Sequence, residues 1–146
     1  MITVRRATIN DIDTVADLFD QYRIFYKQTS DIPKAKEFLK ERIEKEESAI
    51  LIAFANDEAV GFTQLYPIFS SVSMRRAWLL NDLFVKPTAR KTGVGNKLLD
   101  AAKDFGAETN AKWLILETSE DNFTAQSVYE GNGWQKSSSF FYQFNL

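Results

Sequence analysis

The residues with the clearest chemical potential lie in the stretch 85–95, Val-Lys-Pro-Thr-Ala-Arg-Lys-Thr-Gly-Val-Gly. It follows an apolar run and opens a helical pattern, and the free N–H groups of a helix N-terminus bind phosphate. Gly93 and Gly95 keep the backbone accessible. Four cations lie in or beside the stretch: Lys86, Arg90, Lys91 and Lys97. We interpret it as a pyrophosphate site, and for this motif alone a solvated loop before a helix is the alternative.

Histidine and cysteine are both missing from the 146 residues. Their absence excludes disulfides, thiol nucleophiles and Ser-His-Asp or Cys-His catalysis. It also removes the usual zinc ligands, so we expect no metal. A general base must then be Asp, Glu, Lys, Tyr or a relayed water. The sequence contains neither Gly-Lys-Ser/Thr nor Gly-x-Gly-x-x-Gly, which excludes the P-loop and dinucleotide fingerprints.

A second segment, residues 116–134, gives the glycine loop a context. It carries Asn-x-x-Ala-x-x-x-Tyr, followed by Gly and Trp four and five residues after the Tyr. The residues in this spacing are Asn122, Ala125, Tyr129, Gly133 and Trp134. Together with the Arg-x-x-Gly-x-Gly loop and the Val-x-Pro before it, this pattern resembles the GNAT superfamily of N-acetyltransferases along nearly the whole chain. The run Asn-Asp-Leu-Phe-Val at 81–85 and an aromatic first helix look like the branch of diamine and thialysine acetyltransferases.

The resemblance implies that acetyl-CoA binds where two parallel strands splay apart, the one ending at Val85 and the one around Leu116. Its pyrophosphate would lie on the loop, and its pantetheine would pair with strand backbone. A backbone N–H near Leu83 or Phe84 would polarise the acetyl carbonyl. The implied cofactor-binding residues are Leu83, Phe84, Val85, Arg90, Lys91, Thr92, Gly93, Val94, Gly95 and Asn122.

Tyr129 matches the general acid of the family, which protonates the departing CoA thiolate. A phenol has a reference pKa of about 10, so it holds its proton at neutral pH. From residue type alone, a core aromatic on a helix is the alternative for this position. Because no Cys or His is present, direct transfer in a ternary complex is favoured over a covalent acetyl-enzyme.

The general base is less clearly marked. An alkylammonium acceptor must lose a proton before it attacks, which costs about 4 kcal/mol at pH 7. Diamine acetyltransferases typically have Glu at the position of Asn81, and an amide cannot take the proton. Asp82 is our candidate catalytic base if a bulge turns it inward; otherwise alternation places it on the opposite face as a partner of Arg75 or Arg76. Glu117 and a water wire are the further candidates.

The acceptor pocket of the family is built from the first two helices, their loop and the hairpin strands. Aromatic faces there suit a cation. The candidate substrate-binding residues are Tyr22, Phe25, Tyr26, Tyr66, Asn81 and Glu117. For the aromatic ones, packing in the core of a chain with 12 Phe is the alternative.

The hydrophobic pattern that must position these residues predicts the order β-α-α-β-β-β-α-β-α-β. The expected strands are 2–7, 50–55, 60–66, 78–85, 113–117 and 140–144, and the expected helices are 11–26, 33–46, 93–105 and 123–132. Asn10, with Asp13 three residues later, is the expected cap of the first helix. We predict an α/β (α+β) fold with a GNAT-like mixed sheet of six to seven strands, splayed parallel strands in its middle, about four flanking helices, and a single domain, 1–146.

Composition limits the partners. The net charge is −2, which argues against a nucleic-acid binder that relies on bulk charge. No apolar run approaches the roughly 20 residues that span a membrane, and the N-terminus lacks the apolar region of a signal peptide, so we expect a cytoplasmic protein with no membrane partner. The resemblance adds a homodimer paired through the final strand as an expectation.

Three functional classes stay open from the sequence. The first is an acetyltransferase for a small-molecule amine, with acetyl-CoA as co-substrate. The second is an acetyltransferase for a protein lysine or N-terminus, and the third is a CoA-binding regulator without turnover. Tyr129 favours the two enzymes over the regulator.

Overall fold

A five-stranded sheet with the order β1-β2-β3-β4-β5 organises the computed structural model, which describes residues 1–146. The strands are β1 Ile2–Arg6, β2 Ala49–Ala55, β3 Glu58–Ser70, β4 Arg75–Val85 and β5 Leu114–Ile115. The helices are α1 Ile12–Phe25, α2 Ile32–Glu44, α3 Val94–Glu108 and α4 Phe123–Gly131, with the short 3-10 turns η1 Ile9–Asp11 and η2 Pro87–Ala89. The first four strands are antiparallel, and β5 runs parallel to β4.

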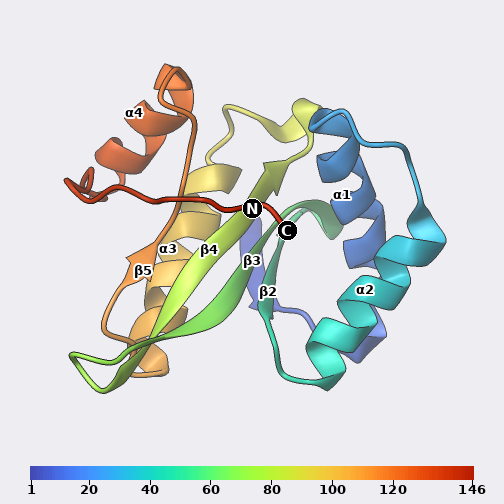
Figure 1. The fold of residues 1–146 in the computed structure, drawn as a ribbon. Helices are drawn as coiled ribbons and strands as arrows, with labels where there is room; N and C mark the ends of the chain where they lie inside the picture. Colours follow the sequence, from blue (N-terminus) through green and yellow to red (C-terminus); the bar gives the residue numbers. More distant parts are fainter.

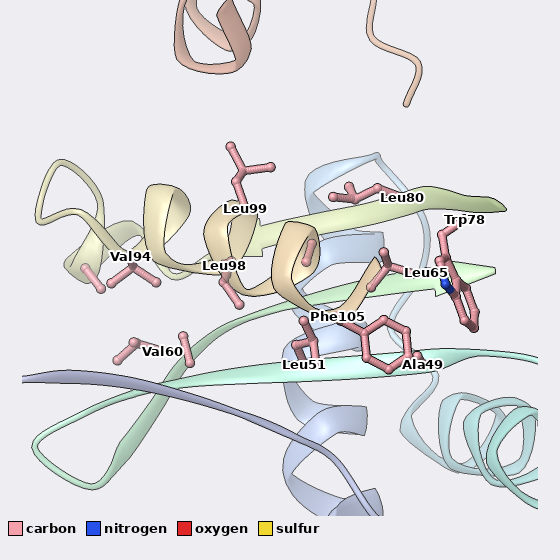
Figure 2. Close-up of a cluster of buried hydrophobic side chains, with 13 residues drawn as sticks. Ala49, Leu51, Val60, Leu65, Trp78, Leu80, Val94, Leu98, Leu99 and Phe105 are labelled. Atoms are coloured by element: carbon pink, nitrogen blue, oxygen red, sulfur yellow. The ribbon is translucent and has the colours of Figure 1, made fainter. Parts of the chain in front are cut away.

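Helices cover both faces of the sheet, α1 and α2 on one and α3 on the other (Figure 1). Residues of β2 alternate between two cores: Ile50 and Ile52 pack with α1 and α2, while Leu51 and Ala53 pack with α3. A strand buried on both faces has no solvent-exposed face for polar side chains, which explains the continuous apolar run in β2. Figure 2 shows the core beneath α3, where Leu98 and the neighbouring α3 residues lie over the strands.

The predicted order of helices and strands is confirmed up to α4, but the sheet has five strands rather than six to seven. Residues 140–144 form no strand because no edge of the same chain pairs with them. The strand expected at 113–117 shortens to Leu114–Ile115 because its partner β4 diverges from it. None of the helices combines the length and apolarity needed to traverse a lipid bilayer.

The cap expected for α1 was also wrong. Thr8, rather than Asn10, caps the turn η1 that leads into α1, because Thr8 and Asp11 form a reciprocal capping box. Arg5 forms a 2.8 Å ion pair with Asp11 and, as hydrogen-bond donor, lowers the pKa of that carboxyl to about 2. In α2, Asp31 accepts a hydrogen bond from the Lys34 N–H and fixes the helix start beside Pro33.

A β-bulge in β4 sets the orientation of the residues that follow it. Gln64 of β3 pairs with Asp82 and Leu65 pairs with Leu80, so Asn81 is the extra residue. Leu80 faces α3, and simple alternation would turn Asp82 to the same side. The extra residue instead places Asp82 and Phe84 on the face covered by α1.

At Gly61 of β3, α3 packs closely against the sheet. A Cβ there would lie 2.7 Å from the Phe84 carbonyl oxygen and 3.3 Å from Val94 and Leu98. We expect Gly61→Ala to lower the free energy of unfolding by about 1–3 kcal/mol, measured by urea denaturation. Gly131→Ala is the matched control, since a Cβ there meets nothing within 4 Å. Equal stability of Gly61→Ala and the wild type would contradict this close packing.

Candidate active site

A cavity opens where β4 and β5 part. The two strands pair only at Trp78–Leu114 and Leu79–Ile115. Beyond these pairs, a cavity of about 970 Å³ lies between residues 80–85 of β4 and residues 116–119 after β5. Its remaining walls come from the end of α1, the loop before α3, and α4.

One end of the cavity has the chemistry of an anion site. Gly93 adopts a left-handed conformation (φ 94°) and caps α3, whose first intrahelical hydrogen bond runs from the Lys97 N–H to the Gly93 carbonyl. The N–H groups of the first turn therefore have no helical partner. A Cβ on Gly93 or Gly95 would meet nothing within 4 Å, so the space above this backbone is open to a ligand. This loop fits the pyrophosphate expected from its sequence.

Most of the expected cofactor-binding residues border this cavity. Leu83, Phe84, Val85, Arg90, Lys91, Gly93, Gly95 and Asn122 line it. Thr92 and Val94 do not, because the Thr92 hydroxyl donates to the Ala89 carbonyl and the Val94 side chain is in the core. These two residues can contribute only their backbone N–H groups.

Arg90 links the loop to the opposite wall. Its Nε donates to the Val85 carbonyl oxygen at 3.0 Å, and its guanidinium lies 5.5 Å from the centre of the Phe25 ring at the end of α1. The side chain is exposed and has no carboxylate partner. Its charge is therefore available to a bound anion.

Tyr129 reaches the cavity from α4. Asn122 caps this helix by accepting from the Ala125 N–H, and Tyr129 packs on Trp134 with ring centres 6.3 Å apart. Burial raises the pKa of the Tyr129 phenol, which keeps it protonated at neutral pH. No residue of α4 is fully buried. Asn132, directly after α4, contacts α3: its Nδ2 donates to Asp100 at 3.0 Å, and its backbone carbonyl accepts from Lys103 Nζ at 2.8 Å.

Asp82 is buried, with 3% of its surface exposed, and it does not line the cavity although Asn81 does. Its carboxylate accepts from Gln64 Nε2 and, at 3.0 Å, from Asn81 Nδ2. The expected alternative, an ion pair with Arg75 or Arg76, is wrong. The bulge turns Asp82 toward α1, whereas both arginines stand at the far end of β4.

Burial raises the pKa of Asp82, and hydrogen bonds from Gln64, Tyr22 and Asn81 offset part of that rise. The carboxyl thus retains a proton to higher pH than an exposed aspartate would. A buried carboxylate with a raised pKa beside a cavity is a candidate general base.

The aromatic candidates divide into two groups. Tyr22, Phe25 and Tyr26 line the cavity, as do Asn81 and Glu117. Tyr66 lies outside it, on β3 opposite Leu79, and burial raises its pKa to about 12.

Gln64 is a residue of this region that the sequence did not single out. It is fully buried on β3, and its Oε1 has no hydrogen-bond partner. A single amide within the apolar run 60–66 was the available signal, because buried polar side chains require partners.

Comparisons with known proteins identify the family of this chain. Residues 12–134 match the "Acetyltransferase (GNAT) family". The chain is 52% identical over 139 residues to an "Uncharacterized N-acetyltransferase YhfO" of Bacillus subtilis (strain 168), covering 95% of this chain and 93% of that protein. It is 32% identical over 126 residues to a "Probable acetyltransferase" of Haemophilus influenzae, covering 86% and 84%.

Solved structures share the fold. A crystal structure of a probable acetyltransferase has 39% identity and a TM-score of 0.94, covering 99% of this chain and 97% of that one. More distantly, an aminoglycoside acetyltransferase from a soil metagenome, in complex with sisomicin, has 18% identity and a TM-score of 0.83 over 99% and 97% of the two chains. At that identity the likeness is one of fold alone.

The loop chemistry makes a prediction for Gly95. We expect Gly95→Asp to weaken acetyl-CoA binding at least tenfold, because it places a negative charge where the phosphates approach; titration calorimetry measures this. A carboxylate in the first turn of a helix favours the helix, so the loss of affinity will not come from unfolding. Gly131→Asp, on α4, is the control with the same charge change. Unaltered affinity in Gly95→Asp would remove the pyrophosphate assignment.

Proposed function

This chain belongs to the acetyltransferase (GNAT) family and is an N-acetyltransferase, and from that premise we propose that it acetylates a primary amine of a small molecule. The observation that carries this proposal is the single continuous cavity that joins the anion-binding loop to an aromatic end. Tyr129 stands on its wall together with Tyr22, Phe25 and Tyr26. Acetyl-CoA and an amine acceptor could therefore bind next to each other in one cavity.

The aromatic end suits a small cation. Tyr22 and Phe25 of α1 and Tyr26 directly after it line this end, and Glu117 adds a negative charge. Aromatic rings and a carboxylate both attract an ammonium group. The sisomicin complex of the distant aminoglycoside acetyltransferase gives a precedent for a multi-amine acceptor on this fold.

The reaction assigned to the site is direct transfer in a ternary complex. The acetyl carbonyl would be polarised by a backbone N–H near Leu83 or Phe84. Tyr129 would protonate the sulfur of CoA as the C–S bond breaks, and Asp82 would take up the proton that the acceptor ammonium loses. No nucleophilic Cys is available for a covalent acetyl-enzyme.

The identity of the amine is tested by a panel. We expect turnover with acetyl-CoA and at least one of spermidine, 1,5-diaminopentane, free lysine and sisomicin, measured as thiol release. Spermidine and 1,5-diaminopentane test the resemblance to diamine acetyltransferases, which typically have Glu at the position of Asn81. Turnover of a lysine-containing peptide alone would favour the protein acetyltransferase. Acetyl-CoA binding without turnover of any amine would favour the regulator.

With the best amine of that panel, we expect Tyr129→Phe to lower kcat by about 100-fold or more, because general acid catalysis typically contributes that much. The Kd for acetyl-CoA should stay within about twofold, since the phenol acts on sulfur only as the bond breaks. Ser127→Ala, which removes an exposed hydroxyl from the same helix outside the cavity, is the matched control. An unchanged kcat in Tyr129→Phe would show that another group is the acid.

We further propose that the active protein is a homodimer paired through residues 140–144. Phe140, Tyr142 and Phe144 are 88%, 98% and 87% exposed, and alternation would place them on one face of a strand. The segment forms no strand within its own chain, while β5 leaves one edge of the sheet free. A second copy of the chain offers both a strand edge and a matching apolar surface.

Sedimentation equilibrium tests this assembly. We expect the wild type to sediment at about twice the chain mass of 16.7 kDa at micromolar concentration. The double variant Phe140→Ser/Phe144→Ser should sediment as a monomer, because it removes apolar area from the pairing segment. A wild type that sediments as a monomer at these concentrations rules out the dimer.

A further inference from the structure

Asp82 is a buried acid without a compensating cation. All eight ion pairs of the chain use other carboxylates. Two neutral amides hold it instead, those of Gln64 and Asn81. Neutral donors compensate a buried charge only partly, so a carboxylate in this setting gains from accepting a proton. This environment suits proton uptake better than a purely structural ion-pair role.

The Asp82 carboxylate nevertheless does not line the cavity. Asn81 stands in the lining, and Asp82 lies behind it, on the side of the sheet covered by α1. An ammonium group bound in the cavity therefore cannot reach Asp82 directly. A group that touches both the cavity and Asp82 is required.

Tyr22 is positioned to be that group. It lines the cavity, and it also acts on the Asp82 carboxyl, whose pKa it lowers. Its ring stands edge-on to Phe62 and Phe84, with centres 5.8 and 6.4 Å away. Gln64–Asp82 is the next pair on the same face of β3 and β4. The packing thus holds the phenol over the sheet beside the buried carboxylate.

We propose that Tyr22 relays the acceptor's proton to Asp82, an inference that rests on the proposed amine acetylation. As an N–H bond of the ammonium breaks, the Tyr22 oxygen gains that hydrogen, and the former phenol proton forms an O–H bond with an Asp82 carboxylate oxygen. The amine lone pair becomes free to attack the acetyl carbon. A second amine proton replaces the one that Tyr129 gives to sulfur, and Asp82 later returns its proton to solvent.

The surrounding groups favour a relay over a tyrosinate base. Burial and the negative charge of Asp82 raise the pKa of Tyr22, so this phenol stays protonated between transfers. Tyr26, directly after α1, and Tyr66 of β3 are its other titratable neighbours, and both are neutral when protonated. Arg42 of α2 acts on Tyr66 and is paired with Glu41 and Glu47, and no cation is among the groups that shift the pKa of Tyr22. No cation therefore stabilises a phenolate at Tyr22.

The pH dependence of kcat/KM tests the relay, with the panel amine that the wild type acetylates fastest. With the relay, kcat/KM is level between the pKa of Asp82 and that of the amine, because the enzyme removes the proton itself. Tyr22→Phe keeps the ring and loses the relay, so only amine already deprotonated in solution can react. For an amine with a pKa near 10, we expect a loss of about 1,000-fold at pH 7, a tenfold rise per pH unit, and convergence with the wild type near the pKa of the amine.

Three variants keep the test decisive. Asp82→Asn should reproduce the sloping profile, and Tyr22→Phe/Asp82→Asn should lose no more than either single variant, because both residues act in one path. Tyr26→Phe, an adjacent cavity tyrosine, should change the rate by a factor that does not depend on pH. A Tyr22→Phe profile parallel to the wild type overturns the relay. A wild type that acetylates no amine overturns the proposed function itself.

Discussion

The parting of β4 from β5 is the constraint on which the rest of the site depends. A parallel pair of strands normally continues its hydrogen bonds, but here it holds for two residue pairs only. The separation leaves the backbone of residues 80–85 facing a cavity instead of a neighbouring strand. It also sets α4 apart from the sheet, so that Tyr129 can approach the cavity from the far wall. The loop before α3 closes the cavity at the end where the anion would lie.

A single inserted residue governs the polar side of the same cavity. The bulge at Asn81 reverses which side chains of β4 face α1, and it brings Asp82 into register with Gln64. The carboxylate then accepts hydrogen bonds from two amides instead of pairing with an arginine. Stability alone would favour a hydrocarbon at such a position. The cost of the buried acid is easier to understand if the acid takes part in the reaction.

Features that depend on local sequence could be predicted well, whereas features that depend on the register between strands could not. The glycine loop and the spacing of Asn122 and Tyr129 located two walls of the cavity because backbone conformation and helix periodicity are local properties. The sequence could not predict whether β4 contains a bulge, because the pairing of β4 with β3 determines it. Tyr66 was expected in the pocket but lies outside it, for the same reason. The alternation of residues 140–144 is typical of a strand, but a strand forms only where a neighbouring strand edge is available to pair with it.

The shallow seating of α4 has a consequence for motion. A helix with no fully buried residue loses little apolar contact when it detaches, so we expect its local opening to cost little free energy. Its amide hydrogens should therefore exchange with solvent through local opening, well before those of β2 and β3. A ligand lying between β4 and α4 would connect the sheet to this loosely packed helix. Occupancy of the site would then slow exchange in α4.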